Sequence, residues 1–100
     1  MAMGSQLYRL GKLPGGYFST AEAINNKGEV VGYGDTDDGW VHPFYYHWGT
    51  MTQLPEPPSS LSAIAVGINN RGEIVGSYLD WDYNVFPIVW KQSRLLPLVP

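Results

Sequence analysis

Aromatic residues stand beside carboxylates in two short loops of this 100-residue chain. A planar aromatic ring can stack on a sugar ring, and a neighbouring carboxylate can accept hydrogen bonds from sugar hydroxyls. The residues that could bind a carbohydrate in this way are Trp40, Asp37 and Asp38 in the first loop and Trp81, Tyr83, Asp80 and Asp82 in the second. Trp and Tyr are also enriched where protein units pack together. We therefore favour packing against a neighbouring unit and keep carbohydrate binding as the alternative.

Asp80, Asp82 and Asn84 have the spacing of the first three ligands in an oxygen-rich calcium loop. Val85 replaces the glycine that such a loop needs next, and Lys91 stands at the twelfth position where Glu is required. We therefore expect a solvated loop whose Asp and Asn side chains cap backbone N–H groups, with no metal and no cofactor.

The two histidines are unsuited to bind one ion together. His42 and His47 are five residues apart in an extended segment, so their side chains point to opposite faces. His42 shares its face with Phe44, which is apolar. We expect a partly buried His42 whose ring nitrogens have hydrogen-bond partners.

A hydrolytic site needs a nucleophile, a base and an orienting acid that meet in the fold. The serines at 59, 60, 62 and 93 fall in turn-like segments, and the glutamates are isolated from one another. Glu29 and Glu73 occupy the same place in two similar segments, which indicates a role in turns. We predict no catalytic residues and no enzymatic activity.

These residues are carried by two copies of one unit, offset by 44 residues. Residues 21–32 match residues 65–76, and both segments contain Asn-Asn-x-Gly-Glu, then two β-branched residues and Gly. The match continues without a gap to Tyr46 and Trp90. Self-similarity at a fixed period is the signature of a repeat architecture.

Each unit has the pattern of four short antiparallel strands. Asn-Asn-x-Gly at 25–28 and 69–72 predicts a hairpin turn, because Asn and Gly tolerate the backbone conformations that such turns need. The strands are expected at about 19–24, 29–33, 41–48 and 51–54, and again at about 63–68, 73–78, 85–91 and 95–98. We expect a single all-β domain over residues 1–100, made of two repeats at about 19–62 and 63–100 with an extra strand near 7–10.

The strands are apolar on both faces. In the third strand, Phe44, Tyr46 and Trp48 share one face, while the opposite face carries Pro43 and Tyr45. A sheet with one face in water alternates apolar and polar residues, so we expect both faces of these sheets to be covered. Such units are typical of β-propeller blades, with a pseudo-twofold β-sandwich as the alternative.

Two repeats leave outer faces without a neighbour, since about three or more are usually needed for stability. We therefore favour a homo-oligomer in which copies of the chain complete a ring. The extra strand near 7–10 could complete a sheet of a neighbouring copy.

The motif Ala-Ile-Asn-Asn-x-Gly-x-Val-Val-Gly, followed by His-Pro-Phe at 42–44, resembles the HAF-type repeat of bacterial, often extracellular, proteins. Residues 10–16 also fit the stretch between such repeats, and the resemblance covers nearly the whole chain from about Leu7. Pro43 stands where the family usually has Ala, and the second copy has Phe-Pro-Ile at 86–88. The resemblance implies propeller-like repeat arrays and an extracellular location, and it implies no defined activity.

Composition excludes several classes of partner. The net charge is −3 and the six Lys and Arg residues are scattered, so we expect neither nucleic-acid binding nor binding to an anionic membrane. The absence of cysteine excludes disulfides and thiolate metal sites. No apolar run approaches the roughly 20 residues that span a bilayer. Residues 1–5 lack the basic and apolar segments of a signal peptide, and the residues do not indicate a compartment.

Overall fold

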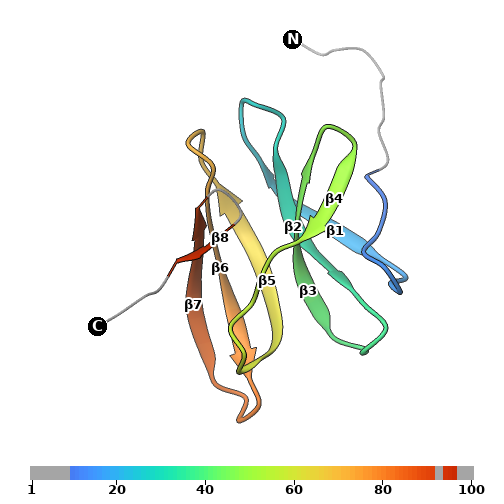
Figure 1. Ribbon diagram of the computed structural model, residues 1–100, viewed down its shortest axis with the longest axis vertical. Helices are drawn as coiled ribbons and strands as arrows, with labels where there is room; N and C mark the ends of the chain where they lie inside the picture. The colour runs from blue at the N-terminus through green and yellow to red at the C-terminus, as the bar shows by residue number, and fades with distance from the viewer. Residues whose placement is uncertain (1–9, 92–93, 97–100) are drawn as a thin grey trace.

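The chain forms two four-stranded antiparallel sheets, as the computed structural model in Figure 1 shows. The structure describes residues 10–91 and 94–96, and within them it contains no helix. The first sheet contains β1 (Ser19–Ile24), β2 (Val30–Asp35), β3 (Val41–His47) and β4 (Thr50–Gln53). The second contains β5 (Ser60–Ile68), β6 (Glu73–Asp80), β7 (Val85–Lys91) and β8 (Arg94–Leu96). In each sheet the strands pair in chain order, so the predicted all-β architecture with two antiparallel sheets is confirmed.

Both Asn-Asn-x-Gly segments form the hairpin turns that the sequence predicts. The N–H of Gly28 donates to the carbonyl oxygen of Asn25 at 3.2 Å, and the φ angle of Gly28 is 76°, where a side chain would be strained. The Asn25 side-chain oxygen accepts the N–H groups of Lys27 and Glu29, each at 3.0 Å. Asn69 makes the same contacts in the second copy. Each turn is therefore held by its own first residue.

Some strand ends differ from the expected ones. β3 ends at His47, because Trp48 adopts a φ angle of 55° and turns the chain with Gly49. The Trp48 side chain is 88% exposed, so the expected aromatic face of the third strand ends at Tyr46. β5 begins at Ser60, three residues earlier than predicted, because Ser60 pairs with Asp80. Of the expected extra strand near 7–10, only Leu10 is among the described residues, and it is not in a strand.

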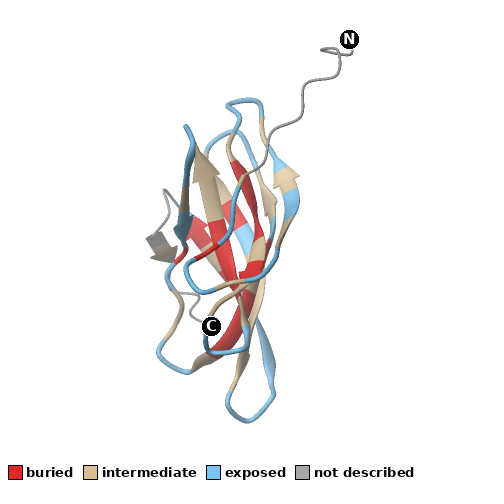
Figure 2. Cartoon of the chain, turned by 90° about the vertical axis from the view of Figure 1, so that its right-hand side faces the viewer, coloured by how far each residue is buried: buried red, intermediate tan, exposed pale blue. Residues whose placement is uncertain are grey.

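The two sheets pack face to face, with β5 lying against β1, β2 and β3 (Figure 1). Figure 2 shows the buried residues gathered in the middle of the molecule, with exposed turns at both ends. Buried side chains from both halves form this core: Val31, Leu54, Ala65, Ile74, Ile88 and Trp90. Two hydrogen bonds cross it, from Trp90 Nε1 to the Pro55 carbonyl and from Ser62 Oγ to the Val41 carbonyl, both at 2.7 Å.

The faces that meet are not equivalent. Val31 of the first sheet is fully buried in the interface, whereas Val75, its counterpart 44 residues on, is 48% exposed. A pseudo-twofold sandwich would bring equivalent faces together, so the two sheets are not related in that way. The other face of the first sheet packs on the segment before β1, where Leu13, Val30 and Phe44 form a second buried cluster.

Gly32 and Gly76 let neighbouring strands approach closely. A Cβ atom on Gly32 would collide with the Thr20 carbonyl oxygen, and one on Gly76 would collide with the Ile64 carbonyl oxygen. Both sites lie beside an irregularity in strand pairing, at Ala21/Ala23 and at Ala65/Gly67. The Gly of the repeated motif is therefore required by backbone packing.

We predict that Gly76→Ala lowers the free energy of unfolding by about 1–3 kcal/mol, because the methyl group meets backbone that can move only with its whole strand. Ser77→Ala, at the next residue of β6, should change it by less than about 0.5 kcal/mol. Urea unfolding measures both. Equal stability of the two variants would contradict the close approach.

Candidate functional site

The first acidic loop uses one of its carboxylates to hold its own shape. One oxygen of Asp38 accepts the Trp40 N–H at 2.8 Å and the Thr36 hydroxyl at 2.9 Å. The other oxygen of Asp38 lies 2.8 Å from Nε2 of His42. Asp37 and Trp40 are exposed on the same loop. Asp38 is therefore engaged within the chain.

The second acidic loop is a tight turn held by Asp80. The Asp80 side chain accepts the N–H groups of Asp82 and Asn84, each at 2.9 Å, as expected for a capping residue. Trp81 and Tyr83 are each 68% exposed, and Tyr83 has a φ angle of 65°. Over the described residues, no three His, Cys, Asp or Glu side chains converge as metal ligands.

The two loops do not form one site. They extend from different sheets (Figure 1), and no hydrogen bond between described residues joins them. Asp38 and Asp80 are engaged in their own turns, which leaves Asp37 and Asp82 as the carboxylates beside the exposed aromatic rings. Carbohydrate binding through Trp40, Trp81 and Tyr83 stays a prediction.

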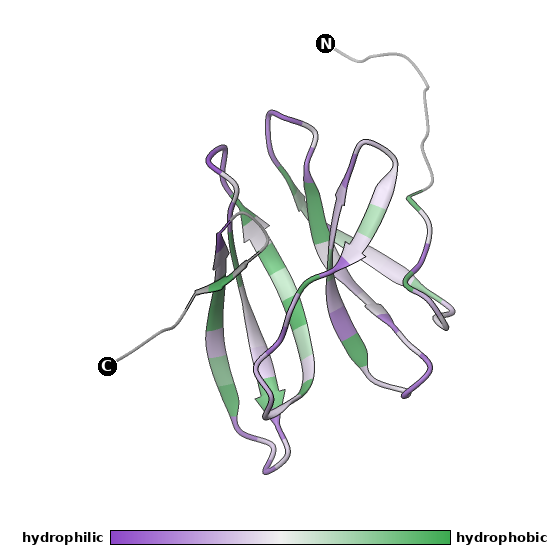
Figure 3. Ribbon diagram, in the orientation of Figure 1, coloured by the Kyte–Doolittle hydropathy of each residue, from purple (hydrophilic) through white to green (hydrophobic). Residues whose placement is uncertain are grey.

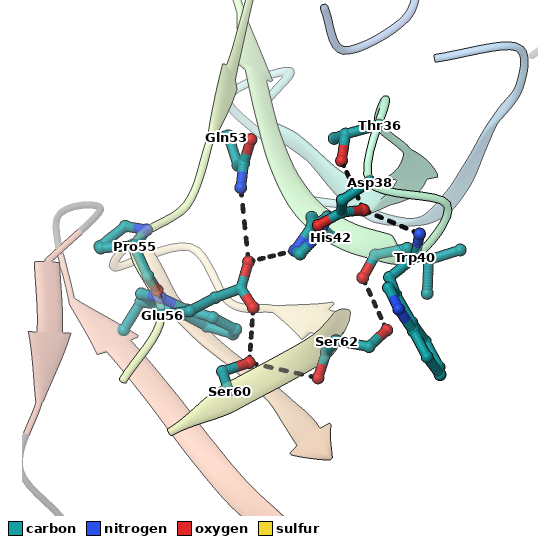
Figure 4. A network of polar contacts seen from close by, with 11 residues as sticks. Thr36, Asp38, Trp40, His42, Gln53, Pro55, Glu56, Ser60 and Ser62 are labelled. Atoms are coloured by element: carbon teal, nitrogen blue, oxygen red, sulfur yellow. Dashed lines mark hydrogen bonds and ion pairs between the residues drawn. The ribbon is translucent and has the colours of Figure 1, made fainter. Parts of the chain in front are cut away.

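A network of polar contacts surrounds His42 (Figure 4). His42 is only 8% exposed, and its Nδ1 lies 2.6 Å from a Glu56 oxygen while its Nε2 faces Asp38. The other Glu56 oxygen accepts the Ser60 hydroxyl at 2.6 Å. The prediction of a buried histidine with both nitrogens paired is confirmed. The network joins the β2–β3 loop and β3 to the linker that leads into β5.

The two carboxylates favour the protonated form of His42. Burial alone would lower the pKa of His42, but the hydrogen bonds and charges of Asp38 and Glu56 outweigh it and raise that pKa above 6.5. Burial raises the pKa of Asp38, but hydrogen bonds from the Trp40 N–H and His42 lower it by more, so the net shift of this pKa is downward. The contacts with Asp38 and Glu56 therefore stabilise the charged form of His42 relative to the neutral form.

The hydrogen bonds of this network differ from those of a hydrolytic site. The Ser60 hydroxyl donates to Glu56, and both nitrogens of His42 are engaged with carboxylates. A hydrolase would instead need the hydroxyl to donate to the imidazole. The pairing of His42 with Glu56 could not be predicted from the sequence, because Glu56 lies 14 residues from His42 in a proline-rich linker.

No protein-family model, no curated protein and no solved structure matches this chain. No helix of the described residues is long and apolar enough to cross a membrane.

The outer face of the second sheet is more exposed than the equivalent face of the first sheet. Val75 and Val85 are exposed there, and so is Pro87, while the corresponding Val31 and Pro43 of the first sheet are fully buried. Figure 3 shows hydrophobic residues at several positions along β7. We call this surface the open face and define it by Val75, Val85, Pro87 and Val89.

A pocket of about 230 Å³ lies at one end of the open face. Its lining residues are mostly apolar and come from β5, β6 and β7: Ser62, Ala63, Ile64, Ser77, Tyr78, Leu79 and Val85. The pocket has no charged side chain in its lining, so it is suited to apolar groups.

We predict that His42→Gln lowers the free energy of unfolding by about 1.5–3 kcal/mol near pH 6, since hydrogen bonds to charged groups are lost. Because folding raises the pKa of His42, its contribution is full below the ordinary pKa of 6.5 and is lost as the pH rises through the raised value. The stability difference between the variant and the unmodified chain should therefore shrink as the pH rises above 6.5. Unfolding titrations at several pH values measure it.

His47→Gln is the matched control, because His47 is more exposed than His42 and its ring contacts the Lys27 carbonyl oxygen and the rings of Tyr45 and Trp48, with no carboxylate hydrogen-bonded to it among the described residues. This variant leaves His42, Asp38 and Glu56 in place and should keep the pH dependence of the unmodified chain. Identical pH dependence in His42→Gln and the unmodified chain would contradict the claim that folding raises the pKa of His42.

Proposed function

We propose that this chain is a non-enzymatic β-repeat module that associates with copies of itself and serves a structural or binding role. The observation that carries this proposal is the open face. The positions that the first sheet buries under the second are exposed on the second sheet, where no further sheet of the described residues covers them.

Physical chemistry favours covering this face. Complete burial of an exposed valine side chain contributes about 1.5–3 kcal/mol, and contiguous apolar surface on a soluble protein commonly marks an interaction site. A face with apolar residues at Val75, Val85, Pro87 and Val89 has few groups that interact well with water. Association of copies would remove it from solvent.

The packing inside the chain supports a propeller-like arrangement. Non-equivalent faces meet, so one sheet can stack on the next in the same way repeatedly, as blades do. Such a contact closes into a ring if the rotation between sheets allows it. The resemblance to HAF-type repeats agrees with this arrangement.

We expect the unmodified chain to have a mass of two or more chains by light scattering at micromolar concentration. Val75→Lys should shift it to the mass of one chain, because the charge would be buried without a partner in the assembly. Ser59→Lys changes the net charge equally at an exposed turn position and should keep the assembly. A single-chain mass for the unmodified protein at all concentrations would refute self-association.

A further inference from the structure

The hairpin turns of the two repeats are joined by hydrogen bonds that run in one direction. Nδ2 of Asn25 donates to the carbonyl oxygen of Asn69 at 2.9 Å, and the backbone N–H of Asn26 donates to the side-chain oxygen of Asn70 at 2.8 Å. Each bond links residues 44 apart, which are the same position in the two repeats. The first turn supplies the donors and the second supplies the acceptors.

Each turn therefore contains both the donor groups and the acceptor groups of this contact. Within one chain, only the donors of the first turn and the acceptors of the second turn are used. Asn69 Nδ2 donates to Glu73 at 2.6 Å, as Asn25 Nδ2 does to Glu29 at 2.5 Å, so the second turn is arranged like the first. The Asn70 N–H and the Asn26 side-chain oxygen make no hydrogen bond to another described residue. Asn69 is exposed where Asn25 is half-buried.

Each sheet also has one apolar surface that the contact between the two sheets does not cover. The open face of the second sheet corresponds to the face of the first sheet that is buried between the sheets. On the outer side of the first sheet, Ile24 is 67% exposed, whereas its counterpart Ile68 packs against the core between the sheets. Leu10 packs on the cluster that contains Val30, and Leu54, its counterpart 44 residues on, belongs to the cluster that contains Ile74, so a leucine stands at the equivalent place on both sheets.

We propose that the open face binds the outer side of the first sheet of a second copy of this chain, head to tail. The Asn69 amide would donate to the Asn25 carbonyl of the neighbouring copy, and the Asn70 N–H to its Asn26 side chain. This inference rests on the proposed self-association and adds its direction, its two faces and its polar contacts. The contact is heterologous, so it propagates from copy to copy until a ring closes.

Two blocked variants test the direction. Val75→Lys blocks the open face and Ile24→Lys blocks the outer side of the first sheet, and both sites are exposed enough in one chain to accept lysine. In a head-to-tail contact each variant alone has the mass of one chain, and an equal mixture gives a complex of two chains. Light scattering of the mixture measures this.

The other outcomes are distinct. If Ile24→Lys associates alone and mixing adds nothing, two open faces meet each other and the head-to-tail contact is wrong, while self-association stands. If the unmodified chain also has the mass of one chain throughout, the proposed function itself fails.

Asn26→Ala tests the polar contact. Its side-chain oxygen has no role within the described chain, so we expect an association constant about 3–10-fold lower, the effect of one hydrogen bond, with unchanged unfolding. Asn70→Ala is the matched control, because it removes the acceptor of the bond within the chain and should weaken folding while keeping association. Association of Asn26→Ala equal to that of the unmodified chain would overturn the asparagine contact.

Discussion

The structure depends on the packing of β5 and its sheet against a non-equivalent face of the first sheet. Trp90 and Ile74 fill one side of this interface, and Val31 fills the other. This contact buries one face of each sheet and does not cover the opposite face of either sheet. The segment before β1 packs on the reverse face of the first sheet, whereas the open face remains in solvent. A close-packed contact of this kind tolerates little change in shape, so it also fixes how a further sheet would have to fit.

Much of the fold follows from local chemistry that the sequence displays. The turns at 25–28 and 69–72 are predictable because Asn and Gly satisfy the backbone within four residues. The end of β3 was not predictable, since Trp48 adopts a left-handed conformation that a large side chain rarely takes. The early start of β5 depends on Ser60 pairing with Asp80, which are 20 residues apart and meet only in the folded sheet.

The candidate sites also depend on contacts between residues that are distant in the sequence. The burial of His42 follows from its place beside Phe44 in the strand, but its partner Glu56 comes from a linker whose path the sequence does not specify. Asp38 and Asp80 hold the loops that carry them through bonds to backbone N–H groups, the capping role that their residue type predicts, and carbohydrate binding by these loops stays a prediction. The two repeats have matching apolar patterns, so the pattern alone could not tell that Val31 is buried and Val75 is not. That difference arises from which neighbour each sheet has.

The chain has no cysteine, so a single introduced thiol can report directly whether the open face is covered. The most direct measurement is the rate at which a thiol reagent modifies Val75→Cys as the protein concentration is raised. The account predicts that this rate falls as copies associate, whereas the rate for Ser59→Cys in the exposed turn before β5 stays constant. A rate for Val75→Cys that is the same at every concentration would contradict the claim that another copy covers this face.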